Sequence, residues 1–278
     1  MSVKLKNTPL RCPCNGDYFA KAFVYDAPPE GETRFSFSSE NYHREVWQCQ
    51  ICHHFVSTCD MDLSELYRED YVSSTYGEKG IKHTFDRIIS LPPGKSDNIG
   101  RVQRIVEFAE NYLKLPAAEN RPPRILDVGS GLGVFPYQIQ KAGWKVTALD
   151  PDPRMVAHIR EAIGTNTVCG NFMELSDLGR FDIISFNKVL EHVEDPVTML
   201  AKSQQHLNKG GIVYIEIPDG EASAMRGKGR EEFFIEHFHI FSIASIALLA
   251  SRAGFQPIKI ERLQEPSTKY TLRAFLRL

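Results

Sequence analysis

From residue 124 onward, short apolar runs alternate with segments whose apolar positions recur at helical spacing. The apolar runs predict strands at residues 124–129, 145–150, 166–170, 181–187, 211–218, 255–263 and 270–278. The segments between them predict amphipathic helices at residues 134–143, 153–163, 196–207 and 242–253. Apolar strands that alternate with helices are typical of a parallel sheet covered on both faces. The pattern therefore predicts a doubly wound α/β domain.

The first part of the chain divides where this pattern changes. Residues 1–60 are polar and turn-rich between two close pairs of cysteines, and they predict a small domain with a short hairpin. Residues 61–98 include a helix that leads into the tyrosine-rich loop YVSSTYG, and we expect them to form a linker or substrate lid. A further helix begins at the N-cap Ser96. Residues 99–278 are predicted to form the large domain.

A glycine-rich turn follows the first strand of the large domain. In ILDVGSGLGVF, Gly129, Gly131 and Gly133 lie between a buried strand and a helix, after Asp127. Glycines here let the backbone approach a ligand, and the helix N-terminus favours negative charge. The spacing is not that of a dinucleotide site, which would need a third glycine at position 134, where valine stands. On its own the turn also fits a tight strand-to-helix connection without a ligand.

Polar residues follow the next strands at the same edge of the predicted sheet. Asp150 ends the second strand and is placed to accept hydrogen bonds from ribose hydroxyls. Asn171 and Phe172 follow the third strand, where they are suited to the edge and face of an adenine ring. The fourth strand ends in FNKVLEHVEDP. Ligands of open α/β sheets bind at the carboxyl ends of the strands, so this agreement favours a nucleotide-like ligand.

These motifs, with LNKGGIVYIEIPD, resemble those of the class I S-adenosylmethionine (SAM) dependent methyltransferases over about residues 99–278. The resemblance implies a Rossmann-like sheet of seven strands whose last strand is antiparallel. It also implies that Gly129, Gly131 and Gly133 hold the methionine end of SAM and that Asp150 holds the ribose. The other cofactor residues that it implies are Asp127 near the methionine end, Asn171 and Phe172 at the adenine, and Asn187 below the sulfonium.

A narrower resemblance links the cysteine pairs, YVSSTYG, SDNIGR and IEHFHIFS to methyltransferases with an N-terminal zinc-binding domain, including sugar C-methyltransferases. It implies an active site formed by Tyr71, His192, Glu236 and His237. Those enzymes continue into a further C-terminal domain, whereas this sequence stops with the methyltransferase sheet. A sugar or nucleotide-sugar acceptor, and C- as against O- or N-methylation, are therefore left open.

The stretch FFIEHFHIFS at residues 233–242 contains two histidines among aromatic residues. Such a histidine is usually a hydrogen-bonded structural residue, but this stretch follows a long loop after the fifth strand, at the edge where SAM is expected. SAM carries its own leaving group, so the enzyme has chiefly to align the acceptor and remove a proton. The resemblance implies that His237 removes the proton, with Glu236 orienting His237 or holding a substrate hydroxyl. It implies that His192 and Tyr71 position the acceptor. His239 is then structural.

The cysteines at positions 12, 14, 49 and 52 form the pairs CPC and CQIC. Four thiolates suit tetrahedral Zn²⁺, which would stabilise a region too small and polar to fold on its core alone. Cys12, Cys14, Cys49 and Cys52 are therefore predicted to bind one structural zinc ion. Reduced cysteines without metal remain the alternative. Substitute ligands would be His53, His54 or Cys59.

Composition separates the candidate functions. The 278 residues carry a formal charge of −2, and residues 1–60 hold six Lys or Arg against seven Asp or Glu. A region with this charge balance binds nucleic-acid phosphates weakly. A small-molecule acceptor is therefore favoured over RNA, the alternative substrate. A SAM-binding regulator without activity is a weaker third option. The sequence shows no membrane span or signal peptide, so a cytoplasmic enzyme is expected, with no nucleic-acid or membrane partner.

Overall fold

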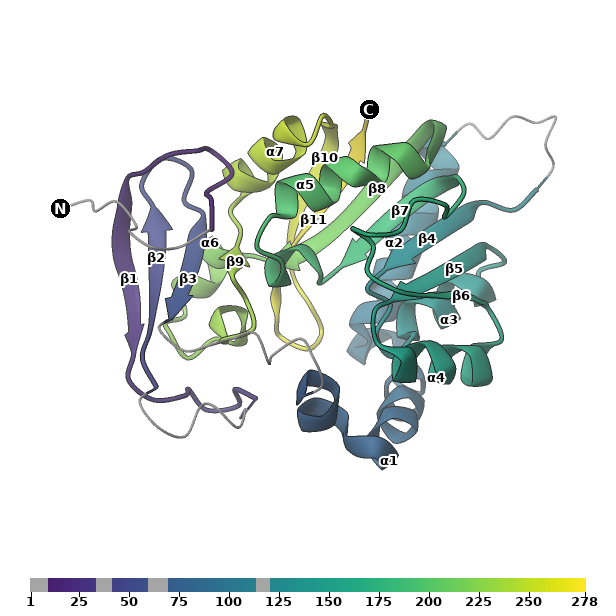
Figure 1. Cartoon of the computed structure of the whole chain (residues 1–278), viewed down its shortest axis with the longest axis horizontal. Helices are drawn as coiled ribbons and strands as arrows, with labels where there is room; N and C mark the ends of the chain where they lie inside the picture. The colour runs from purple at the N-terminus through teal and green to yellow at the C-terminus, as the bar shows by residue number, and fades with distance from the viewer. Residues whose placement is uncertain (1–9, 34–41, 60–69, 114–120) are drawn as a thin grey trace.

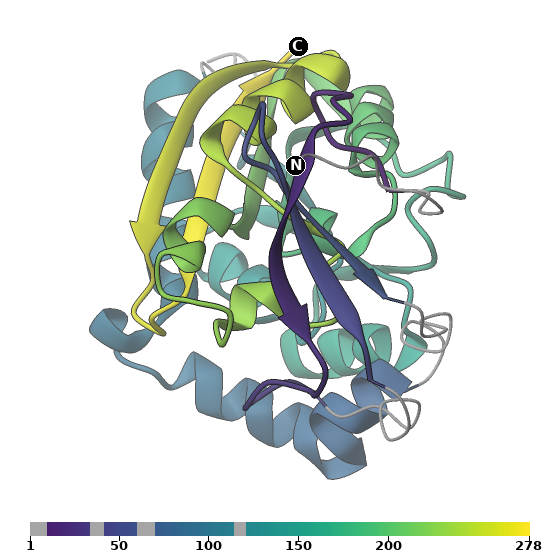
Figure 2. The same ribbon diagram turned by 90° about the vertical axis from the view of Figure 1, so that its left-hand side faces the viewer.

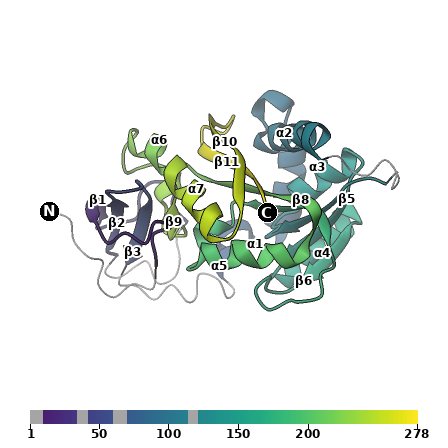
Figure 3. The same cartoon turned by 90° about the horizontal axis from the view of Figure 1, so that it is seen from above.

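The computed structural model of the chain describes residues 10–33, 42–59, 70–113 and 121–278, and for residues 70–79 only the backbone. Two sheets lie side by side along the long axis of the molecule (Figures 1 and 3). The smaller has four strands and the larger has seven. Among the described helices, none is both long and apolar enough to span a membrane.

The large sheet has the strand order β10-β11-β8-β7-β4-β5-β6. Five strands, β8, β7, β4, β5 and β6, are parallel, and β11 is antiparallel to both of its neighbours. This confirms the expected mixed sheet with an antiparallel last strand. The strands are β4 (Arg124–Val128), β5 (Lys145–Asp150), β6 (Asn166–Cys169), β7 (Phe181–Asn187), β8 (Leu207–Pro218), β10 (Gln256–Gln264) and β11 (Tyr270–Arg277).

Helices pack on both faces of this sheet. One face is covered by α2 (Asp97–Tyr112) and α3 (Val134–Lys141), and the other by α5 (Pro196–Lys202) and α7 (Ile243–Arg252). The helix α4 (Pro153–Ile163) contacts β5 and β6. Ser96 caps α2, as predicted, because its hydroxyl accepts from the amide of Ile99 at 3.2 Å.

The small sheet consists of β1 (Phe19–Tyr25), β2 (Arg44–Cys49), β3 (Phe55–Cys59) and β9 (His239–Ile240), all antiparallel. Its first three strands come from the N-terminal part of the chain, and Figure 2 shows β1 and β2 in front of the rest of the molecule. Its fourth strand comes from the stretch that precedes α7. The hairpin predicted from sequence is therefore part of a sheet that residues of the C-terminal half complete.

Two segments differ from the sequence-based expectation. The tyrosine-rich stretch expected to be a loop belongs to α1 (Asp70–Ile89). The segment after β8, expected to be a long loop, contains α6 (Gly220–Ala224) and β9. The chain also forms short 3-10 helices at η3 (Pro93–Lys95), η4 (Leu190–His192), η5 (Ser203–His206) and η6 (Glu231–Phe233).

Candidate active site

The glycine turn connects β4 to α3 with a left-handed backbone at each glycine. The φ angles are +72° at Gly129, +49° at Gly131 and +76° at Gly133. A Cβ at Gly129 would lie 2.6 Å from Val189, and one at Gly133 would lie 2.7 Å from Ile159. A Cβ at Gly131 would meet no atom within 4 Å. The outer glycines are therefore needed for packing, while Gly131 borders open space.

Asp150, at the end of β5, fastens this turn. One carboxylate oxygen accepts from the amide of Gly131 at 2.8 Å, and the other accepts from the amide of Asp152 at 2.9 Å. Burial raises the pKa of Asp150, because the charged form loses hydration. Each carboxylate oxygen can accept a second hydrogen bond, so the side chain can hold both the turn and a ligand.

Asp127 and Asn187 meet where β4 and β7 end side by side. One oxygen of Asp127 accepts from Ser185 and from the Asn187 side-chain amide, each at 2.8 Å. Burial raises the pKa of Asp127 to about 6. The side-chain oxygen of Asn187 is buried and has no hydrogen-bond partner within the described ranges. This pair therefore presents an unused acceptor beside the glycine turn.

The two residues expected at the adenine are oriented differently from each other. The Asn171 side chain is exposed and bonded locally, accepting from the amide of Met173 at 3.0 Å and donating to Glu174 at 3.1 Å. Phe172 is buried in the core, with its ring 5.8 Å from that of Phe186. Asn171 thus lies at the expected strand end, whereas Phe172 faces the core.

His192 and His237 lie together although they are 45 positions apart in the sequence. Their ring centroids are 4.9 Å apart. The Nδ1 atom of His192 is 2.8 Å from the Glu236 carbonyl, and that of His237 is 2.9 Å from the Glu232 carbonyl. A carbonyl only accepts, so each Nδ1 carries the proton and each Nε2 is left as an acceptor. Burial lowers the pKa of both histidines, which favours the neutral form.

Glu236 and Tyr71 are the other two residues expected at the acceptor site. Glu236 is adjacent to His237, and burial raises the pKa of its carboxyl. Tyr71 belongs to α1, but its side chain lies outside the described part of the structure. The structure adds Glu191, a buried carboxylate that the sequence analysis missed. The only signal for it was its place directly before His192 at the end of a buried strand.

His239 occupies a buried position between the two sheets. Its ring Nδ1 is 2.9 Å from Nε2 of His54, and its Nε2 is 3.2 Å from the carbonyl of Glu194. His54 also contacts the hydroxyl of Ser245 at 3.2 Å. These contacts give His239 and His54 a structural part in joining β3 to the C-terminal half.

The thiols of Cys12, Cys14, Cys49 and Cys52 converge at the end of the small sheet. Sulfur–sulfur distances are 3.2 Å between Cys12 and Cys52, 3.3 Å between Cys12 and Cys14, and 3.5 Å between Cys14 and Cys49. Zn–S bonds of about 2.3 Å in a tetrahedron place sulfurs roughly 3.8 Å apart, so a small expansion would admit the ion. The hydrogen bond between Cys12 and Cys52 lowers the pKa of Cys52 and raises that of Cys12, so of this pair Cys52 is the thiolate. The donor set fits structural zinc.

Three basic residues after α6 are held by protein groups. Arg226, Lys228 and Arg230 donate hydrogen bonds to Tyr270, the Val24 carbonyl and Glu232, respectively. Their contacts therefore connect the segment to both sheets.

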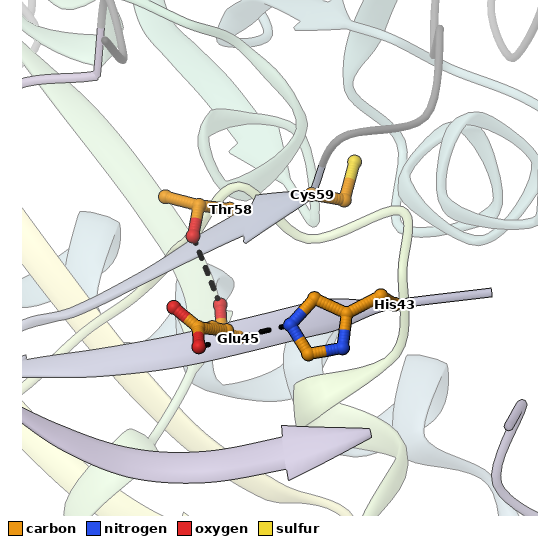
Figure 4. Close-up of a pocket in the computed structure, with 4 residues that line it drawn as sticks. All are labelled: His43, Glu45, Thr58 and Cys59. Carbon is orange, nitrogen blue, oxygen red and sulfur yellow. Dashed lines mark hydrogen bonds and ion pairs between the residues drawn. The ribbon is translucent and has the colours of Figure 1, made fainter. Parts of the chain in front are cut away.

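A separate pocket of about 170 Å³ lies on β2 and β3, in the small sheet rather than at the glycine turn. Its lining residues are His43, Glu45, Thr58 and Cys59 (Figure 4). The Thr58 hydroxyl donates to the Glu45 carbonyl at 3.4 Å, and the ring of His43 is 3.7 Å from the Glu45 carboxylate. The pocket is small and polar, so it does not suit SAM.

Solved structures with this fold include methyltransferases. The 1,6-didemethyltoxoflavin-N1-methyltransferase of Burkholderia thailandensis superposes with a TM-score of 0.56 at 20% identity, over 89% of this chain and 99% of that chain. The magnesium protoporphyrin IX methyltransferase of Synechocystis PCC 6803 gives 0.52 at 16% identity, over 74% and 96%. At these identities the similarity shows the fold alone.

Curated relatives match part of the chain. A ubiquinone biosynthesis O-methyltransferase of Xanthomonas campestris pv. campestris (strain B100) is 30% identical over 117 residues, 40% of this chain and 47% of the relative. A cypemycin N-terminal methyltransferase of Streptomyces sp is 25% identical over 151 residues, 52% of this chain and 61% of the relative. The chain thus spans about half the length of these relatives.

A family model described as a methyltransferase domain matches residues 101–260, which is more than half of the chain. The match includes the glycine turn, Asp150, Asn187 and both histidines of the candidate site. The chain therefore belongs to the methyltransferase domain family.

Proposed function

We propose that the protein transfers a methyl group from SAM to a small-molecule acceptor. The observation that carries this proposal is the contact between Asp150 and Gly131. It joins the ends of β4 and β5 into one surface, and open space lies beside Gly131. A nucleoside with a cationic amino-acid tail suits a surface that offers buried carboxylates and a close backbone approach.

The proposed position of SAM follows the polar groups at this edge. The methionine end lies against Gly129, Gly131 and Gly133, near the unused side-chain oxygen of Asn187 and the Asp127 carboxylate. The ribose hydroxyls donate to Asp150. The adenine lies near Asn171, which is exposed, and the loop above Phe172. Because the Phe172 ring is buried in the core, it supports this loop.

In the proposed reaction the acceptor lies beside His192 and His237, in line with the methyl group. The neutral ring of His237 leaves Nε2 as a proton acceptor, because its Nδ1–H donates to the Glu232 carbonyl. His192, Glu236 and Tyr71 orient the acceptor. Removal of the proton accompanies or precedes attack on the methyl group, and S-adenosylhomocysteine leaves.

The division into a zinc-binding domain at residues 1–60, a lid segment at 61–98 and a methyltransferase domain at 99–278 is also a proposal. The converging thiols support structural zinc in the first of these. Its ligands would be Cys12, Cys14, Cys49 and Cys52. Zinc there would hold the β2–β3 turn against the N-terminal segment, and the methyl transfer would not require it as a reactant.

The acceptor is proposed as a small molecule such as a sugar or nucleotide-sugar, methylated at carbon or oxygen. The relatives' names support the small-molecule class by including ubiquinone biosynthesis. RNA methylation is the second candidate, which the domain order of some zinc-containing RNA enzymes favours. Six cations against seven carboxylates in residues 1–60 weigh against it.

The test is a SAM-turnover assay across nucleotide-sugars, phenols and other small acceptors, with the methyl position of the product assigned by NMR. We expect S-adenosylhomocysteine to form only with a small acceptor present, and without nucleic acid. Methyl transfer to RNA alone, steeply reduced by salt, would reverse the choice between the two candidates. Failure to bind SAM in a calorimetric titration would reject both.

A further inference from the structure

Glu191 is a buried carboxylate that the proposed reaction does not use. Its side chain has 0% exposure, and neither carboxylate oxygen has a hydrogen-bond partner within the part of the chain that the structure describes. Burial raises its pKa to about 7. Leaving a buried polar group unsatisfied costs about 1–3 kcal/mol, and more for a charged group. Such a carboxylate in a native protein commonly has a cation as its partner.

Both neighbouring histidines have one ring nitrogen that is free to accept. The Nδ1 atoms of His192 and His237 are occupied by the Glu236 and Glu232 carbonyls, so both rings have their acceptor at Nε2. Histidines that bind metals almost always donate their other ring N–H to a carbonyl or carboxylate, because that bond fixes the tautomer and the ring orientation. Two adjacent histidines here already have this arrangement.

The spacing of the three side chains leaves room for an ion between them. Glu191, His192 and His237 each offer one ligand atom, and these atoms all lie within 4.8 Å of one another. No hydrogen bond among the described residues joins Glu191 to either ring. Bonds of about 2.0–2.2 Å from one ion place two ligands at most about 4.3 Å apart, so small side-chain rotations are sufficient.

Lys269 attracts the Glu191 carboxylate weakly, and the stronger cation among the described residues near this group is Lys188. It attracts the Glu191 carboxylate electrostatically, but its ammonium donates to the hydroxyl of Thr271 at 3.0 Å. Burial lowers the pKa of Lys188, because the charged form loses hydration. Lys188 therefore reduces the negative potential without filling the space between the carboxylate and the two rings.

We propose that Glu191, His192 and His237 bind one divalent transition-metal ion at the carboxyl edge of the large sheet. Two imidazoles and one carboxylate suit Zn²⁺, Fe²⁺, Co²⁺ or Mn²⁺, whereas Mg²⁺ and Ca²⁺ prefer oxygen ligands alone. Three protein ligands leave at least one coordination position open, since these ions take four to six. The half-buried rings of His192 and His237 connect that position to the proposed acceptor site.

This site is independent of the thiol cluster, and its existence does not depend on the proposed function. One consequence does rest on that function. A bound ion occupies Nε2 of His237, the atom proposed to remove the acceptor proton, so loading the site should suppress turnover. Metal binding and turnover are therefore measured separately, and each can fail without the other.

The test is a Co²⁺ titration of the full chain after its metal content has been measured, without SAM or acceptor. Cobalt at the thiol cluster gives an intense thiolate-to-metal charge-transfer band. Cobalt at the proposed site gives only weak visible bands, because its ligands are nitrogen and oxygen. We expect one equivalent of cobalt to bind with the weak visible bands of nitrogen and oxygen ligands. Elemental analysis of the purified protein then identifies the natural ion as zinc, iron or manganese.

The variants Glu191→Gln and Glu194→Gln form a matched pair in the same segment. Glu194 is exposed, so its variant should bind cobalt like the parent protein. Glu191→Gln should weaken binding by more than about 100-fold, since even loss of an outer-shell partner costs about 10–100-fold. His237→Gln, checked for folding by its melting temperature, should do the same. Absence of the second equivalent at millimolar cobalt, or unchanged binding in both ligand variants, would overturn the site.

A turnover measurement on the loaded protein completes the experiment. Loss of activity with restoration by a chelator would support both the site and the base role of His237. Binding of cobalt with unchanged or increased turnover would support the site and reject His237 as the base.

Discussion

The two sheets of this protein are stabilised in different ways. In one apolar cluster of the small sheet, three of the five buried residues are cysteines. A second cluster is completed by Phe233, Ile235 and Ile240 from the C-terminal half. The large sheet has continuous apolar cores on both faces. The small sheet therefore depends on a few strong contacts. The large sheet is stabilised by its apolar faces, and the polar residues at its carboxyl edge contribute less to that stability.

This difference separates two kinds of substitution. Changes in the thiol cluster or in the buried ion pair of the small sheet should alter folding. Changes at the carboxyl edge of the large sheet should alter ligand binding or turnover while the fold remains. The comparison would be wrong if substitutions at the carboxyl edge unfolded the protein. It would also be wrong if substitutions in the small sheet abolished activity without unfolding it.

The largest expected effect is that of Cys49→Ser on the small sheet. Structural zinc contributes apparent binding free energies of about 10–16 kcal/mol in zinc-finger peptides, so losing one ligand should remove the ion and unfold this sheet. Elemental analysis should fall from one zinc per chain to nearly none, with a lower melting temperature. Cys169→Ser, at an exposed cysteine outside the cluster, is the control. The structural-zinc proposal would be rejected if the parent protein contained no zinc and Cys49→Ser were as stable as the parent.

Glu32→Gln should have the next largest effect. The Glu32 carboxylate accepts from Arg44 at 3.0 Å, and both side chains are 1% exposed. Removing one charge from a buried pair costs about 3–5 kcal/mol, because the partner stays buried without compensation. Glu32 also accepts from the amide of Ile235 at 2.8 Å, so the contact between the two halves should weaken.

The control for that change is Glu45→Gln, which removes a surface pair with Lys21. Exposed pairs contribute about 0–1 kcal/mol, so denaturant unfolding should hardly change. If both variants lost equal stability, the buried ion pair would have no special part in holding the small sheet.

His237→Ala should lower kcat by about 10²–10⁴-fold, the usual contribution of a positioned general base. The melting temperature and the SAM dissociation constant should change little. Burial lowers the pKa of His237 well below its usual value. The acid limb of the kcat profile should therefore lie well below pH 6.5, since the base must be neutral. Full turnover in this variant, with loss in His192→Ala or His239→Ala, would show that another histidine is the base.

Sequence patterns were sufficient for the large sheet because its signals are local. Apolar runs, the glycine turn and the Ser96 cap each depend on neighbouring residues, and the observed strands and α2 follow them. The cysteine spacing likewise anticipated the converging thiols.

The parts that sequence did not predict depend on distant residues. The pairing of β9 with β3 joins segments about 180 residues apart, so no local period indicates it. Glu191 looks like an ordinary polar residue in a turn, and only the fold brings His237 beside it. Phe172 was expected at a ligand, but packing against Phe186 decides its direction.

Asp150→Ala should weaken SAM binding by about 10–100-fold, since hydrogen bonds to charged groups contribute about 1.5–3 kcal/mol each. Calorimetry should show the loss of affinity, and stability should also fall by about 1–3 kcal/mol, because the amides of Gly131 and Asp152 lose their acceptor. The control is Asp152→Ala, which removes the N-cap of α4 and costs about 1 kcal/mol of stability without a ligand contact. Unchanged SAM affinity in Asp150→Ala would contradict the proposed position of the ribose.

Gly131→Ala should have a small effect on stability, and a smaller one than the same change at Gly129. At φ +49° an alanine costs about 1–2 kcal/mol, and its Cβ would meet no protein atom within 4 Å. Gly129→Ala adds a contact of 2.6 Å with Val189, so it should lower the melting temperature more. The methyl group of Gly131→Ala enters the space proposed for SAM, so affinity should fall further than stability does. If Gly131→Ala bound SAM like the parent protein, the open space beside the turn would not be the cofactor site, and the edge of the large sheet would have to bind SAM elsewhere.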